Sequence, residues 1–140
     1  MSSLHSETVV MEPLHQLVDR LTSGHLADAS RNLNFFINQV PRNLKIEQNS
    51  ERIASVISGM IVTANNSTKD SCIRFSAQQY GHLLVLELRE TVRSQPGNDE
   101  NHLLQIQKLA EKIGGCLYVG AREEERILMS FSFPNLPFAA

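Results

Sequence analysis

The chain has 140 residues, of which 41% are hydrophobic and 20% are charged, a composition that supports one domain with its own core. Its formal net charge of −2 excludes the broad basic surface of nucleic-acid-binding proteins, so we expect no nucleic-acid partner. No apolar run approaches the roughly 20 residues that span a bilayer, and the N-terminus lacks the features of a secretory signal. We therefore predict a cytoplasmic chain without a membrane span, in which Cys72 and Cys116 are buried, reduced thiols.

The N-terminal segment combines an unpatterned arm with an amphipathic helix. Residues 1–11 show no periodicity, whereas Pro13 suits the first position of a helix, where a missing N–H removes no hydrogen bond. Apolar residues then follow with the spacing of one helix face, at Leu14, Leu17, Val18 and Leu21. This face has two alternative uses: it packs back onto the domain, or it pairs with a second copy in a homodimer through residues 13–29.

The next segment predicts two strands and a long helix. Residues 32–40 are rich in apolar and aromatic residues, and residues 44–47 form a short strand that we expect to pair with them. A helix then begins at Asn49 or Ser50, because both residue types cap helix N-termini. Its wide apolar face suits packing on a sheet and contains Ile53, Val56, Ile57, Met60, Ile61 and Ala64. Gly59 inside this helix indicates the close approach of another element.

The C-terminal half predicts a hairpin, a helix and a second hairpin. Strands at 72–77 and 83–88 alternate apolar and polar residues on either side of a turn at Gly81. A loop, a helix that stops at a Gly-Gly pair, and two further strands follow at 91–100, 103–113, 116–119 and 127–133. The last two strands are joined by a turn that contains Glu123, Glu124 and Glu125. Helices thus alternate with pairs of strands along the chain.

This order predicts an α/β (α+β) fold: a two-layer sandwich with helices on one face of a mixed, mostly antiparallel sheet. The phenylalanines expected in its core are Phe35, Phe36, Phe75, Phe131 and Phe133. For Phe36 or Phe131, an exposed position is the open alternative.

Three stretches, in this order, resemble the ATP-binding domain of bacterial sensor histidine kinases, which has the Bergerat-type (GHKL) ATPase fold. Residues 41–68 resemble the strand, capped helix and N-box of these kinases, and residues 83–92 resemble the strand that leads to their adenine-binding Asp-x-Gly motif. Residues 104–137 resemble their C-terminal helix, Gly-Gly break and closing hairpin. The resemblance implies an arm and linker helix at 1–30 and a histidine-kinase-like ATPase-fold domain at 31–140, in a single globular unit.

The resemblance also locates the nucleotide site, where this sequence departs from the kinase pattern. Thr63 stands at the position of the N-box Asn that binds Mg²⁺, and Gly59 stands one turn earlier, where the kinases have Asn. Glu90 replaces the adenine-binding Asp, and Val92 replaces the Gly that follows it. The glycine-rich boxes beside the nucleotide lid are missing, which leaves little backbone to cradle phosphates. These four positions outline a degenerate site with no catalytic residue.

The histidines provide neither a phosphoacceptor motif nor a metal site. None of the five lies in a His-Glu-x-x-x-Pro phrase or in HxH or HxxxH spacing: His5, His15, His25, His82 and His102. We expect each to belong to a loop, a turn or a helix surface. The sequence therefore predicts no bound metal ion.

Three functions remain open, and the first is a noncatalytic signalling module. It would need no cofactor and would bind a protein: a kinase, a response regulator or a copy of itself. The alternative is an active or weak ATP-binding histidine kinase or ATPase domain, which would bind ATP and Mg²⁺ through Thr63, Glu90 and residues 91–102. The third is an α/β domain unrelated in function to either. Enzymatic activity is left open, and the eroded motifs favour a pseudo-kinase.

Overall fold

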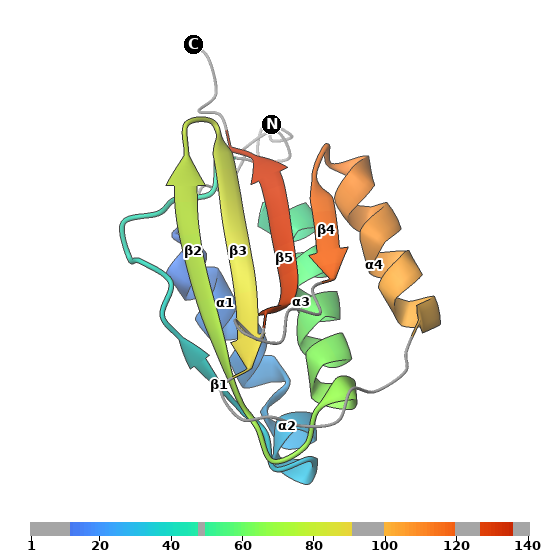
Figure 1. The fold of residues 1–140 in the computed structure, drawn as a ribbon. Coiled ribbons are helices and arrows are strands. Elements are labelled where there is room, and N and C mark those ends of the chain that lie inside the picture. The colour runs from blue at the N-terminus through green and yellow to red at the C-terminus, as the bar shows by residue number, and fades with distance from the viewer. Residues whose placement is uncertain (1–11, 48–49, 91–99, 120–126, 136–140) are drawn as a thin grey trace, which may run out of the picture.

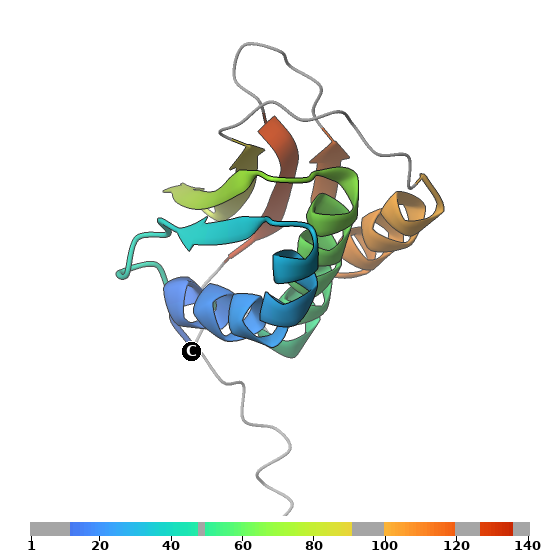
Figure 2. The same ribbon diagram turned by 90° about the horizontal axis from the view of Figure 1, so that it is seen from below.

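The computed structural model describes residues 12–47, 50–90, 100–119 and 127–135, and these residues form two layers (Figures 1 and 2). One layer is a mixed sheet with the strand order β1-β2-β3-β5-β4, and the helices cover one of its faces. The strands are β1 (Phe35–Asn38), β2 (Cys72–Tyr80), β3 (Leu83–Glu90), β4 (Cys116–Val119) and β5 (Ile127–Pro134). The helices are α1 (Leu14–Gly24), α2 (Leu26–Arg31), α3 (Ser50–Ser67) and α4 (Glu100–Lys112). The predicted fold class is confirmed.

The sheet combines one parallel pair of strands with antiparallel pairs. β1 runs parallel to β2 with Phe35 opposite Cys72, so α3 lies in the crossover between them. β2 and β3 form the predicted hairpin, and Gly81 in its turn has a positive φ of 61°, which glycine adopts without strain. β5 pairs antiparallel with both β3 and β4. The crossover places α3 across the sheet.

The core lies between the sheet and the helix layer. Alternate residues of β2, β3 and β5 point into it, and the apolar face of α3 packs on them. The largest fully buried side chains include Phe75, Phe131, Phe133, Ile53, Ile57 and Met60. Each such burial contributes about 1.5–3 kcal/mol. This packing holds α3, which carries two of the predicted site residues, firmly against the sheet.

Helix α1 belongs to the same core. Leu14, Leu17 and Val18 are fully buried, and Leu21 is partly buried against them. Of the two predicted uses of this helix, packing on the domain is the observed one. These side chains are already buried within the chain, and a homodimer through residues 13–29 stays a prediction.

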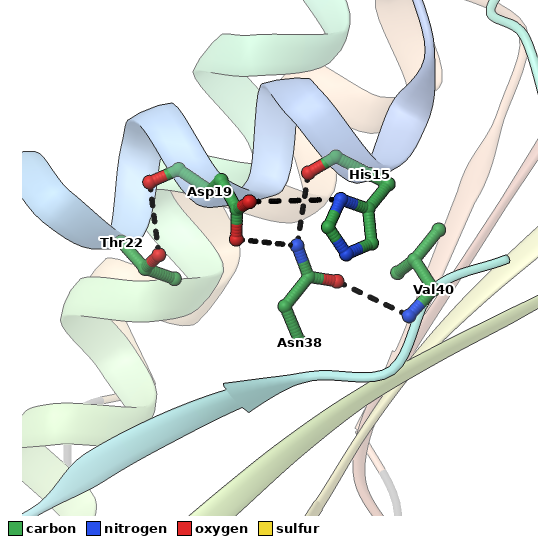
Figure 3. A network of polar contacts seen from close by, with 5 residues as sticks. All are labelled: His15, Asp19, Thr22, Asn38 and Val40. Atoms are coloured by element: carbon green, nitrogen blue, oxygen red, sulfur yellow. Dashed lines mark hydrogen bonds and ion pairs between the residues drawn. The ribbon is translucent and has the colours of Figure 1, made fainter. Parts of the chain in front are cut away.

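A polar contact fixes α1 to the sheet edge, as Figure 3 shows. Nδ2 of Asn38, on β1, donates to the backbone oxygen of His15 at 2.9 Å and to Oδ1 of Asp19 at 2.8 Å. Oδ1 of Asn38 accepts from the backbone N–H of Val40 at 3.1 Å. One side chain therefore joins α1, β1 and the turn that follows β1.

Several local predictions differ from the structure. Helix α1 begins at Leu14, and Pro13 is its extended N-cap, with φ −61° and ψ 134°. The strand predicted at 44–47 is wrong, because Lys45 makes only an isolated bridge to Pro13 and β1 pairs with β2 instead. Residues 1–11, 91–99 and the turn with Glu124 lie outside the described residues.

Three residues that were predicted to be buried are exposed or only half-buried. Cys116 is exposed because β4 turns the neighbouring Leu117 into the core, and Cys72 is only half-buried. Phe35 is 57% exposed at the start of the edge strand β1, whereas Phe131 is fully buried. The other predicted core phenylalanines are buried or partly buried.

Candidate functional site

Gly59 lies on the side of α3 that faces α4. A Cβ built on Gly59 would lie 2.8 Å from Cγ1 and 3.1 Å from Cδ1 of Ile106, so this side chain lies directly on the Gly59 backbone. Ile106 is itself buried. The close approach that Gly59 indicated is thus made by α4, and a hydrocarbon side chain fills the space beside it.

Thr63 is buried one turn farther along α3, with 3% of its surface exposed. Its Oγ1 has no hydrogen-bond partner among the described residues. Leaving a buried hydroxyl unpaired costs about 1–3 kcal/mol, and threonines in helices commonly donate to the carbonyl one turn earlier. Thr63 is therefore a buried polar group that the described packing does not satisfy.

Glu90 ends β3, and its side chain is buried with 5% exposure. Oγ of Ser71, in the turn before β2, donates to Oε2 of Glu90 at 2.8 Å. The carboxylate therefore ties the end of β3 to the turn that precedes its neighbouring strand.

Asn34 extends this contact to α3. Its Oδ1 accepts from the backbone N–H of Ser71 at 3.0 Å, and its Nδ2 donates to Oδ1 of Asn65 at 2.9 Å and to the backbone oxygen of Thr68 at 3.0 Å. All of these residues are buried. A continuous chain of hydrogen bonds thus runs from Glu90 to the C-terminal end of α3, at the end of the molecule where α3 and β3 both finish (Figure 1).

The structure describes three of the four predicted site residues: Gly59, which is partly buried, and Thr63, which is buried, lie on α3, and the buried Glu90 lies on β3. The fourth, Val92, lies outside the described residues. Sequence reasoning missed Ser71 and Ile106. The apolar spacing of α4 together with the helical glycine at 59 is a signal that could have identified Ile106. A lone serine in a polar turn gives no such signal.

The histidines that the structure describes have local contacts. Nε2 of His25 lies 3.0 Å from Oγ of Ser58, and Nδ1 of His15 lies 3.6 Å from Oδ2 of Asp19. Among the described residues, no group of three or more His, Cys, Asp and Glu side chains could hold a metal ion. Within the same ranges of the chain, no helix has the length and apolar character needed to cross a membrane.

No protein-family model and no curated protein matches the chain. Solved structures do match. The nucleotide-free catalytic domain of histidine kinase ThkA has 15% identity and a TM-score of 0.76, over 93% of this chain and 99% of that one. Histidine kinase AdeS of Acinetobacter baumannii has 8% identity and a TM-score of 0.74, over 94% and 71%. A histidine kinase of Burkholderia phymatum STM815 has 13% identity and a TM-score of 0.73, over 92% and 72%.

Identities this low establish the fold alone. The matched chains nevertheless include a catalytic domain that this chain covers almost completely. The chain therefore has the fold of the catalytic, ATPase-type domain of histidine kinases.

Proposed function

We propose that the chain is a noncatalytic signalling module of the cytoplasm, which keeps the fold of a histidine kinase catalytic domain and acts by binding another protein. The contact between Gly59 and Ile106 carries this proposal. In the kinases that the sequence resembles, an Asn stands at the position of Gly59. Here that side chain is absent and Ile106 fills the adjacent space. Mg²⁺ requires oxygen ligands in near-octahedral geometry, which an isoleucine side chain does not provide.

The hydrogen bond between Glu90 and Ser71 supports the same proposal. Its carboxylate accepts a hydrogen bond from Ser71, within the network that reaches α3 through Asn34. An adenine amino group would have to compete with that bond or add to it, and disturbing one member of a buried polar network weakens the others. The side chains in this region fit a magnesium nucleotide poorly, so the proposed role uses no cofactor.

Proteins with this fold support the choice of a protein partner. Histidine kinase ThkA has been solved in complex with the response regulator TrrA, and that kinase structure matches this chain with a TM-score of 0.72 and 14% identity, over 94% of this chain and 43% of that one. A kinase, a response regulator or a second copy is the partner class that we propose. The cytoplasmic location rests on the likeness to the cytoplasmic segment of QseC, at a TM-score of 0.64.

Thr63 supports a second candidate function. Its buried Oγ1 lacks a partner among the described residues, and a bound water or ligand atom would satisfy it. Full-length ShkA, solved in complex with AMPPNP, matches this chain with a TM-score of 0.72, over 95% of this chain and 33% of that one. The second candidate is a weak ATP-binding domain with a remodelled site that includes Thr63 and Glu90.

Thermal unfolding with and without magnesium nucleotide separates the two candidates. A ligand that binds only the folded state stabilises it by about 2.7 kcal/mol at 100 times its Kd. The noncatalytic proposal predicts an unchanged Tm at millimolar Mg-ATP or Mg-ADP. An increase in Tm that Glu90→Ala abolishes and Glu90→Gln weakens would contradict it and support the second candidate. Arg74→Gln, on the opposite face of the sheet, is the control for nonspecific binding of the nucleotide anion.

A further inference from the structure

The sheet face that points away from the helices carries an arginine that the fold does not use. Arg74 lies on β2 between Ile73 and Phe75, which are both buried in the core, so its own side chain points to the other face. Among the described residues it makes no hydrogen bond or ion pair, and its Nε is buried without a partner. An unpaired buried polar group is rare, and the penalty of about 1–3 kcal/mol rises for a charged one.

The strand register also places Arg74 next to a second positive charge, which destabilises the folded chain. Arg74 lies directly opposite Arg89 of β3, and side chains so placed have Cβ atoms about 4.5–5.5 Å apart. Like charges in this arrangement are destabilising. Glu87 forms an ion pair with Arg89, with 3.0 Å between Oε1 of Glu87 and Nη2 of Arg89. The carboxylate of Glu87 is thus paired with Arg89, whereas the buried Nε of Arg74 has no partner among the described residues.

The two arginines line a hollow of about 370 Å³ on this face, which we call the arginine hollow. Its wall also contains Gln39, Ser76 and Tyr80. Tyr80 is 57% exposed. Arginine and tyrosine are the residue types, with tryptophan, that most often dominate binding at protein interfaces. Figure 2 shows that the described helices all lie on the opposite side of the sheet.

We propose that the arginine hollow binds a carboxylate side chain of an acidic protein segment. The proposal rests on the proposed function, because it names the surface through which the module contacts its partner. A guanidinium presents a planar fork of donors that matches a carboxylate, and a bound carboxylate would pair Arg74 and offset its repulsion by Arg89. The hollow is several times larger than one carboxylate group. Apart from the two arginines and Glu87, which pairs with Arg89, the residues that line it are uncharged. A peptide segment fills such a space, whereas a free inorganic anion does not.

Fluorescence anisotropy with fluorescein-labelled octaglutamate tests this proposal, with octaglutamine as the uncharged probe. Octaglutamate is expected to bind saturably, to bind more weakly as salt rises, and to shift the NMR amide signals of β2 and β3. Octaglutamine is expected not to bind. Arg74→Gln should weaken octaglutamate binding at least about tenfold, which corresponds to 1.4 kcal/mol. The matched control is Arg52→Gln, which removes an exposed arginine from α3 and should leave the affinity unchanged.

A thermal unfolding measurement on Arg74→Gln checks that this variant still folds. Because Arg74 has no partner among the described residues and faces Arg89, Arg74→Gln is expected to unfold at the Tm of the original chain or above it. A marked decrease in Tm would show that Arg74 has a structural role and would overturn the proposal. Equal effects of Arg74→Gln and Arg52→Gln on the affinity would overturn it too.

Two further outcomes are informative. Inorganic phosphate or acetate that shifts the same amides at the same concentration as octaglutamate would show a small-anion site and contradict the peptide assignment. Mg-ATP that shifts the amides of Gly59 and Thr63 would overturn the noncatalytic function, and it would leave the octaglutamate result as it stands. The two proposals can therefore fail separately.

Discussion

Ile106 of α4 covers the backbone of Gly59 on α3 so closely that a Cβ on that glycine would lie 2.8 Å from Cγ1 of the isoleucine. Glycine is the residue that permits this distance between the two elements. The position is also the one at which the resembling kinases carry an Asn. The same contact therefore packs α4 onto α3 and underlies the proposal that the chain does not use nucleotide.

Gly59→Ala is expected to destabilise the chain by about 1 kcal/mol. Overpacking a core costs about 1–3 kcal/mol, which exceeds the gain in helix propensity of up to about 1 kcal/mol. The free energy of unfolding in urea measures the effect. Gly24→Ala at the end of α1 is the control, because its new Cβ meets no atom within 4 Å. A Gly59→Ala chain as stable as the original would contradict the contact, and in the Ile106→Ala background the penalty should disappear.

Asn34→Ala is expected to lower the free energy of unfolding by at least about 2 kcal/mol. The change leaves the backbone N–H of Ser71 and the side chain of Asn65 without their buried partner, and each unpaired group costs about 1–3 kcal/mol. Asn66→Ala, at an exposed position on α3, should change stability by less than about 0.5 kcal/mol. Equal effects of the two changes, measured by urea unfolding, would show that the buried network contributes little.

Much of the fold could be predicted because its signals are local. The apolar spacing of α3 and the alternation on either side of Gly81 each lie within one short segment, and both elements are present. The pairing of β1 failed, because its true partner β2 follows α3 in the chain and the nearer segment around Lys45 has a similar pattern. Phe35 was misplaced because local sequence does not show which strand forms the edge of a sheet.

The nucleotide site at Gly59, Thr63, Glu90 and Val92 stays a prediction, and the structure adds the contacts of the first three residues. The resemblance to kinases singled out Gly59, Thr63 and Glu90, of which Thr63 and Glu90 are buried and Gly59 is partly buried. What it could not supply is the partner of each residue, because such contacts join segments far apart in the chain. The hydrogen bond from Ser71 to Glu90 and the packing of Ile106 are contacts of this kind.

Leu17→Ala is expected to destabilise the folded chain by about 2–5 kcal/mol, without changing its state of association. Leu17 is fully buried within the chain, so it is not available to a second copy. Unfolding transitions at several protein concentrations check this, because the Tm of an obligate dimer depends on concentration. Leu26→Ala, where the leucine is 63% exposed, should have little effect on stability. A Tm that becomes concentration-dependent only when Leu17 is intact would contradict the assignment of α1 to the core.

Asn38→Ala is expected to accelerate hydrogen exchange in α1 more than in α3. The change removes the donors to His15 and Asp19 that fix α1 to β1 (Figure 3), so local opening of this helix becomes easier. Exchange followed by mass spectrometry or NMR measures the difference. Gln16→Ala, at an exposed position on α1, is the matched control. Equal acceleration in both helices would mean that Asn38 stabilises the whole domain and does not specifically fix α1.

The most direct test of the central claim is an NMR titration of the labelled chain with Mg-AMPPNP, with the amide signals of Gly59, Thr63 and Ile106 as the reporters. We propose that Ile106 of α4 fills the space beside Gly59 that a nucleotide would need. This proposal predicts that the three amide signals do not shift at millimolar ligand while the chain remains folded. Saturable shifts at the three amides, lost in Glu90→Ala and retained in Arg74→Gln, would contradict it and establish a working nucleotide site between α3 and β3.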